Sequence, residues 1–191
     1  MKRWMMIGLL ISLSSASIYA QESDKLHLSG SLQSDMLLAQ KDSATGAEAT
    51  GSRFRTNTYL DLRLSNRYFE AGARLEYMPH PLPGYEHDFK GWGVPYAYLK
   101  GRYKNAELTL GSFYEQFGSG FILRSYEERS LGIDNSLQGA RLNYLPCTGV
   151  AVKLLTGRQR RYWHHNKSWM TGADVEWNME ESFKSLQEHN T

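Results

Sequence analysis

The densest group of charged side chains lies in segment 111–139, between two stretches that alternate apolar and polar residues. This segment supplies Arg124, Glu127, Glu128, Arg129 and Asp134, and Arg141 follows it by two residues. Charges of both signs that face each other across a passage set a field that selects solutes. We therefore expect these residues to line a constriction, opposite inward-pointing Arg63, Arg74 and Lys100. The alternative is a solvated surface loop whose charges pair among themselves.

The residue types that perform catalysis are present without the spacing that catalysis needs. His87 and Asp88 are adjacent, and no serine with a nucleophile motif accompanies them. His164 and His165 are also adjacent, and neighbouring side chains on an extended segment point in opposite directions. We therefore expect no catalytic residue, no metal site and no cofactor, and we do not expect an enzyme.

Two aromatic segments could make contacts at the surface. They supply Tyr85, Trp92, Arg158, Arg160, Arg161, Tyr162 and Trp163. The planar guanidinium fork of arginine suits phosphate groups, and exposed aromatic rings can stack on sugars. We expect contacts with lipopolysaccharide phosphates or an acidic glycan. The alternative is a pair of loop tips whose long side chains cover apolar surface.

These residues must be positioned by strands, because eight segments alternate apolar and polar residues with a period of two. The segments are 26–38, 53–64, 69–77, 96–103, 106–114, 137–145, 150–157 and 169–177. In two of them the uncharged face begins and ends with an aromatic residue, Phe69 with Tyr77 and Trp169 with Trp177. Such a strand covers about 20 Å along the membrane normal at a tilt of ~40°, close to the ~25 Å apolar band of outer-membrane barrels.

The connections between these segments alternate long and short. They are 39–52, 65–68, 78–95, 104–105, 115–136, 146–149 and 158–168. Outer-membrane barrels have short turns on one side and long loops on the other. We therefore expect an all-β fold, an antiparallel up-and-down transmembrane β-barrel with about eight strands, and a third long loop, 115–136, that folds inward.

The corresponding function is a porin-like passive pore or a surface-transport component with a charged constriction loop. The alternative is a soluble secreted or periplasmic β-sheet protein that binds carbohydrate. In that case Tyr85, Trp92, Tyr162 and Trp163 would form the binding surface.

The run LTLGSFYEQFGSGFILRSYEERSLGIDNSLQGARLNYLP at 108–146, with TGADVEWN at 171–178, resembles the start of a family of outer-membrane barrels from Bacteroidetes of uncharacterised function. Its elements are Tyr-x-x-x-Gly-x-Gly, which begins at Tyr114, and Glu-Arg-x-Leu-Gly-x-Asp-Asn-Ser-Leu-x-Gly-x-Arg, which ends at Arg141. The resemblance implies a surface barrel and no known reaction. Because members of such families are longer, we expect this chain to be an incomplete part of a larger barrel.

The first residues have the order of a secretory signal, with Lys2 and Arg3 before an apolar stretch and small residues before Ala20. The apolar stretch is about half of the ~20 residues that a spanning helix needs. We expect a signal peptide at 1–20 that is cleaved after Ala20, and a β-barrel domain, or its N-terminal portion, at 21–191.

The charge balance and the cysteine content limit the classes of partner and cross-link that the chain can have. Subtracting Lys2 and Arg3 from the 22 basic residues leaves 20, equal to the 20 acidic residues, so nothing favours nucleic acid. Cys147 is the only cysteine, which excludes an intramolecular disulfide. We expect a protein of the outer membrane of a Gram-negative bacterium, whose partners are outer-membrane lipid, lipopolysaccharide, the insertion machinery and small solutes.

Overall fold

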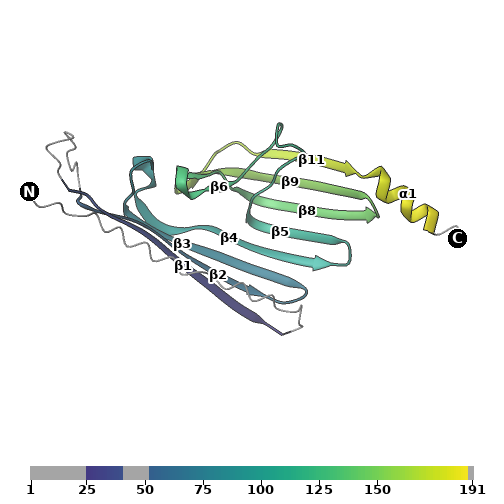
Figure 1. Ribbon diagram of the computed structural model, residues 1–191, viewed down its shortest axis with the longest axis horizontal. Coiled ribbons are helices and arrows are strands. Elements are labelled where there is room, and N and C mark those ends of the chain that lie inside the picture. The colour runs from purple at the N-terminus through teal and green to yellow at the C-terminus, as the bar shows by residue number, and fades with distance from the viewer. Residues whose placement is uncertain (1–24, 41–51, 189–191) are drawn as a thin grey trace, which may run out of the picture.

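The computed structural model describes residues 25–40 and 52–188, with the side chains of 184–188 excepted, so the expected signal peptide at 1–20 lies outside the described residues. All eight expected strands are present. They are β1 (His27–Leu38), β2 (Phe54–Ser65), β3 (Phe69–His80), β4 (Gly91–Tyr103), β5 (Ala106–Phe113), β8 (Leu137–Cys147), β9 (Val150–Arg161) and β11 (Met170–Trp177). The sheet order is β1-β2-β3-β4-β5-β8-β9, with β11 on β9, and all pairs are antiparallel (Figure 1). The all-β, antiparallel, up-and-down order is therefore confirmed.

The sheet is open. β1 and β11 lie at its two edges and do not pair with each other in the part of the chain that the structure describes (Figure 1). A closed barrel is therefore not formed by the described residues. Alternation and connection length specify strands and their order, whereas closure also requires two edges to meet with consistent strand number and stagger.

Several short elements join or follow the long strands. They are β6 (Glu127–Glu128), β7 (Ile133–Asp134), β10 (His164–His165), the 3-10 helices η1 (His87–Phe89) and η2 (Arg129–Leu131), and helix α1 (Met179–Glu188). None of them was expected. Elements of two or three residues are too short to show a period, and the alternating pattern ends at residue 177, before α1 begins. No helix in residues 25–40 and 52–188 is long and apolar enough to cross a membrane.

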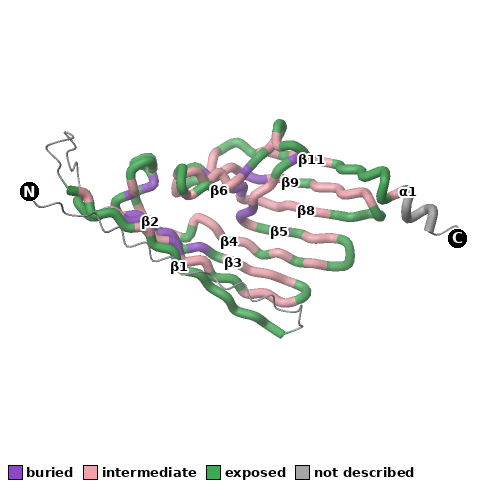
Figure 2. Tube along the Cα trace, viewed as in Figure 1, coloured by how far each residue is buried: buried purple, intermediate pink, exposed green. Residues whose placement is uncertain are grey.

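The two faces of the sheet differ in polarity. On one face the register aligns Leu99 with Leu110, and Leu142 with both Leu108 and Leu154. Exposed apolar side chains extend from β1 to β11 and include Leu28, Leu32, Leu62, Leu75, Leu99, Leu108, Leu110, Leu154 and Val175. Few residues of the sheet are fully buried (Figure 2). We call this the apolar face, and the opposite one, which carries the charges, the polar face.

The long and short connections lie at opposite ends of the strands. We call these the long-connection end and the short-connection end. At the long-connection end the hairpins are joined by 81–90 and 114–136, and at the other end by 104–105 and 148–149. The alternation predicted from the sequence is thus present in the structure.

A row of glycines crosses three neighbouring strands, where Gly111 pairs with Gly139 and Gly139 with Gly157. Gly111 has a φ of +99°, and a Cβ there would lie 2.4 Å from the carbonyl oxygen of Ala97. A Cβ on Gly139 would lie 2.0 Å from the carbonyl oxygen of Thr156. The neighbouring backbones approach too closely to leave room for a side chain. Only glycine fits such a position, and glycine is commonly found where a sheet bends.

Beyond the glycine row the sheet divides into two limbs. β4 pairs with β5 only from Tyr98 to Tyr103, whereas its pairing with β3 continues to Gly91. We call β3 and β4 the first limb, and β5, β8 and β9 the second limb. Segment 114–136 contacts both, since Glu127 reaches Arg74 of β3 and Asp134 reaches Arg160 of β9. In Figure 1 its strand β6 lies between the ends of β4 and β9. The bend therefore opens a gap that this connection fills.

Candidate functional site

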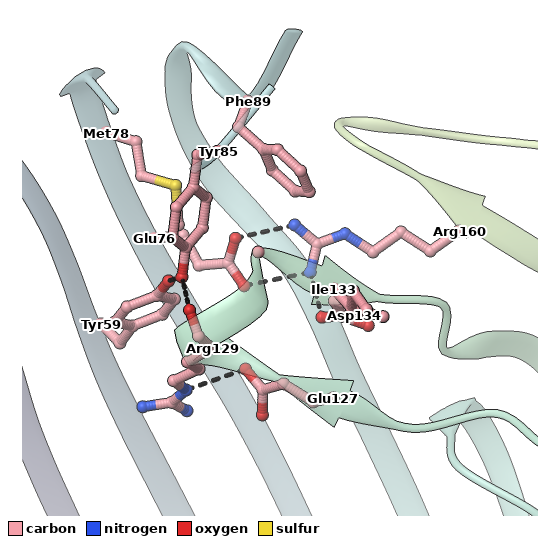
Figure 3. A pocket seen from close by; sticks show the side chains of 11 residues that line it. Tyr59, Glu76, Met78, Tyr85, Phe89, Glu127, Arg129, Ile133, Asp134 and Arg160 are labelled. Atoms are coloured by element: carbon pink, nitrogen blue, oxygen red, sulfur yellow. Dashed lines mark hydrogen bonds and ion pairs between the residues drawn. The ribbon is translucent and has the colours of Figure 1, made fainter. Parts of the chain in front are cut away.

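The centre of the site is an ion pair between the two limbs. Arg160 of β9 is 3% exposed and Glu76 of β3 is 1% exposed. The two nitrogens Nη1 and Nη2 of Arg160 donate to Oε1 and Oε2 of Glu76 at 3.0 and 2.7 Å, and Nη1 also donates to Asp134 (Figure 3). A bidentate pair of this kind is strong and directional, and its burial makes the loss of either partner costly.

A second set of ion pairs fastens segment 114–136 to the first limb and to β2. Nε of Arg74 donates to Asp61 at 2.6 Å, and its Nη1 donates to Oε1 of Glu127 at 2.7 Å. Nε of Arg129 donates to the same Glu127 oxygen at 2.8 Å, and its Nη2 donates to Asp61 at 3.3 Å. The guanidinium of Arg129 also lies 4.2 Å from the ring centroid of Tyr59. Glu127 and Asp61 thus join two arginines from distant parts of the chain.

We call these seven side chains the latch network. Its members are Asp61, Arg74, Glu76, Glu127, Arg129, Asp134 and Arg160. Three arginines and four carboxylates give it a formal charge of −1 (3 − 4). The network can hold segment 114–136 against the polar face of the sheet.

Tyrosines close the network toward the long-connection end. The hydroxyls of Tyr59 and Tyr85 lie 2.9 Å apart, and the Tyr85 hydroxyl donates to the carbonyl oxygen of Arg129. Gly132 ends η2 with a φ of 65°, and a Cβ there would lie 3.2 Å from the Tyr85 ring. The cavity between these groups has a volume of about 10 Å³, room for one water molecule (Figure 3).

Segment 114–136 also contains charged groups whose pKa values reflect their surroundings. Glu128 accepts hydrogen bonds from the hydroxyl and the backbone N–H of Ser130, which hold its pKa below the usual range. Burial lowers the pKa of Arg129, but the hydrogen bond and charge of Glu127 outweigh it and raise the pKa overall. Both groups are therefore charged at neutral pH.

The nine residues expected at a constriction lie in four different settings. Arg74, Glu127, Arg129 and Asp134 meet in the latch network. Glu128 instead caps η2. Arg124 is exposed, with its guanidinium 4.8 Å from the ring centroid of Tyr126.

The remaining three lie nearer the short-connection end. Arg141 contacts Glu107 and Glu115, both at 3.2 Å. Lys100 lies 3.9 Å from Glu70, and Arg63 lies 3.9 Å from the same carboxylate. These three belong to a belt of alternating charges that crosses the polar face. The belt continues through Arg102 of β4 and Lys153 of β9.

The expected surface contacts are dispersed, and one of them is corrected. Arg160 is buried in the latch network, because acidic partners from β3 and β7 offset the cost of removing its charge from water. Tyr85 and Tyr162 pack against the buried cluster of Tyr59, Met78 and Phe89.

The other expected surface residues do not form a common platform. The Trp163 ring lies against Gly91, where a Cβ would be 2.9 Å from its Nε1. Trp92 is 73% exposed. Arg161 is exposed on the β9–β10 hairpin.

Glu76 and Asp61 were not among the site residues predicted from the sequence. Both lie at polar-face positions of alternating strands, which is the signal that could have found them. Arg74, the nearer partner of Asp61, is 13 residues away in the neighbouring strand, but Arg160 is 84 residues from Glu76 and Arg129 is 68 residues from Asp61, and nothing local in the sequence indicates these two distant pairs.

Within the described residues, no group of three or more His, Cys, Asp or Glu side chains could hold a metal ion. A sequence profile described as "Family of unknown function (DUF6029)" matches residues 1–191. No protein with a curated description and no solved structure matches the chain.

Proposed function

The chain belongs to this family of unknown function, and we propose that it forms the wall of an outer-membrane β-barrel that acts as a porin-like passive pore or surface-transport component. One observation carries the proposal. The sheet exposes an apolar face across all eight long strands, while its charged side chains lie on the opposite face, with Arg158 at the long-connection end as the exception. A water-soluble protein covers such a face, whereas lipid is its natural solvent in a barrel wall.

Aromatic residues at both ends of the apolar face support the proposal. Tyr77 and Trp92, which are paired in register, are exposed at the long-connection end. Tyr103, Tyr144 and Trp177 are exposed at the short-connection end. Outer-membrane barrels carry aromatic girdles at both boundaries of their apolar band.

The two open edges of the sheet must be paired if the sheet is to span a membrane. In hydrocarbon every backbone N–H and C=O must be paired, so only closed sheets span membranes. The free edges of β1 and β11 must therefore pair in the membrane, with each other or through further strands. Heated and unheated electrophoretic mobility of protein taken from membranes tests for such a closed, detergent-resistant barrel.

The latch network supports an inward role for segment 114–136. The network holds this segment on the polar face, which would be the lumen side of a barrel. Below it, the belt of alternating charges faces the same side, and the side chain of Arg63 is 61% exposed there. Fixed charges of both signs beside a narrowed passage tune which small solutes pass.

The carbohydrate-binding alternative receives less support from the geometry. A sugar platform needs exposed rings side by side. Tyr85 and Tyr162 instead pack into a buried cluster, and Trp92 projects from a different strand.

The experiment is to express the full chain in a Gram-negative host, extract it from outer membranes and record conductance in planar bilayers. Arg63→Glu should shift ion selectivity toward cations, because it reverses an exposed lumen-side charge. Lys104→Glu, the same charge reversal in the β4–β5 turn, is the matched control. Recovery in the soluble fraction, or equal selectivity of Arg63→Glu and Lys104→Glu, would contradict the proposal.

A further inference from the structure

The charge of one long stretch of the chain is entirely positive. Residues 135–173 contain no Asp or Glu, but they contain Arg141, Lys153, Arg158, Arg160, Arg161 and Lys167. Arg141, Lys153 and Arg160 pair with carboxylates from other segments. The other three cations form no ion pair with any residue of 25–40 or 52–188. Three cations within ten residues of the chain therefore have no compensating carboxylate among the described residues.

Arg158 belongs to the apolar face. It follows Leu154 and Thr156 in the outward row of β9, and the Thr156 hydroxyl lies 3.1 Å from that of Thr171 in the neighbouring β11. In the next position of this row, the Arg158 guanidinium lies 5.5 Å from the ring centroid of Trp169. Trp169 is 62% exposed. Arg158 and Trp169 therefore mark the rim of the apolar face at the long-connection end.

Arg158 is incompletely satisfied in this position. Its Nε is buried and has no hydrogen-bond partner among the described residues. A buried donor without a partner has a cost that a bound acceptor would remove.

The β9–β10 hairpin adds positive charge beside this rim. Arg161 pairs in register with His164, and Arg160 with His165. Burial and the charges of Arg158, Arg160 and His164 hold the pKa of His165 below its usual range. The lowered pKa means that the surroundings of His165 disfavour a further positive charge, and a bound anion would favour that charge.

We propose that Arg158, with Arg161, His165 and Lys167, binds the phosphate group of a lipid headgroup at the rim of the apolar face. The guanidinium fork matches phosphate oxygens, and the neighbouring Trp169 is suited to the boundary between headgroups and hydrocarbon. The inference rests on the proposed function, because it places this rim at a membrane surface.

The experiment uses the full chain purified from outer membranes in detergent micelles and titrated with diphosphoryl lipid A. Dephosphorylated lipid A and inorganic pyrophosphate are the comparison ligands. Arg158→Gln should weaken binding of the phosphorylated lipid by about tenfold or more, as expected for loss of a charge-assisted contact. Arg67→Gln is the matched control, since Arg67 also lies over an aromatic ring, that of Tyr68 at 5.8 Å, but at the short-connection end.

A second variant avoids dependence on the folding of Arg158→Gln. Arg161→Gln combined with Lys167→Gln changes two exposed side chains and should weaken binding by several-fold. Equal binding of wild-type protein and both variants would overturn the inference. Equal affinity for pyrophosphate and for the lipid would overturn the assignment to a lipid.

Failure of the inference and failure of the proposed function give different results. Protein that inserts into outer membranes but binds phosphorylated and dephosphorylated lipid equally would refute the phosphate site alone. Protein that remains soluble, yet binds phosphorylated lipid in an Arg158-dependent way, would support the phosphate site and refute the barrel.

Discussion

Arg160 and Glu76 form a buried bidentate ion pair although three strands, β4, β5 and β8, separate their strands in the sheet. The pair closes the distance between the two limbs beyond the glycine row. Segment 114–136 adds Asp134 to the same guanidinium. The position of this segment thus depends on a contact between residues 84 apart in the sequence.

Arg160→Gln should lower the free energy of unfolding by about 3–5 kcal/mol, because it removes the bidentate partner of the buried Glu76 carboxylate and leaves only Arg74, 3.9 Å away. Denaturant unfolding in detergent micelles measures the change. Arg124→Gln is the control, since this arginine is exposed and outside the latch network. It should alter stability by less than about 0.5 kcal/mol. Equal stability of the two variants would show that the ion pair does not hold the limbs.

Gly139→Ala should destabilise the sheet by about 1–3 kcal/mol or prevent folding, because its Cβ would lie 2.0 Å from the carbonyl oxygen of Thr156. Gly101→Ala is the matched control in β4, where a Cβ would have no atom within 4 Å. Its effect should stay within about 1 kcal/mol. Thermal unfolding of both variants gives the comparison, and a tolerated Gly139→Ala would refute the close approach of β8 and β9.

Cys147 should report the orientation of the sheet in the membrane. It is exposed next to the β8–β9 turn, at the short-connection end. A membrane-impermeant maleimide should label it in permeabilised cells and leave it unlabelled in intact cells, because short turns face the periplasm in outer-membrane barrels.

The control for this labelling is Ser119→Cys in a Cys147→Ser background. Ser119 is exposed at the long-connection end and should react in intact cells. Labelling of native Cys147 in intact cells would reverse the proposed orientation.

Protonation of His165 should destabilise the fold. Burial and the charges of Arg158, Arg160 and His164 lower its pKa in the folded state, whereas the unfolded chain has a pKa near ~6.5. The unfolded state therefore binds the proton more readily, so stability is lost as the pH falls from about 6.5 through the lower pKa of the folded state.

The measurement is the unfolding free energy at several pH values in wild type and His165→Asn. The wild type should lose more stability on acidification than His165→Asn, which lacks this group. Parallel pH curves for the two proteins would contradict the predicted effect.

The sequence predicted the long strands and their order because these depend on local alternation. Leu62 and Arg63 are adjacent residues of opposite character, and they lie on opposite faces of β2. An inward fold of the third long connection was expected, and the structure places segment 114–136 against the polar face of the sheet.

The latch network could not be predicted in full. Arg160 stands in a basic hairpin sequence that indicates an exposed loop, and only tertiary contacts with Glu76 and Asp134 explain its burial. The division of the sheet was also missed, because it depends on Gly111, Gly139 and Gly157 being aligned across three strands, and register is not visible in the chain alone.

Spin-label accessibility in bilayers tests most directly whether the apolar face meets lipid. Labels at Leu62→Cys and Leu99→Cys lie on the apolar face, and labels at Arg63→Cys and Lys100→Cys lie on the polar face. A Cys147→Ser background removes the native thiol. A barrel wall should give high collision with lipid-soluble oxygen and low collision with a water-soluble nickel reagent at the two leucine positions, with the reverse at the other two. Equal accessibility of all four positions to the nickel reagent would show that the apolar face does not meet lipid.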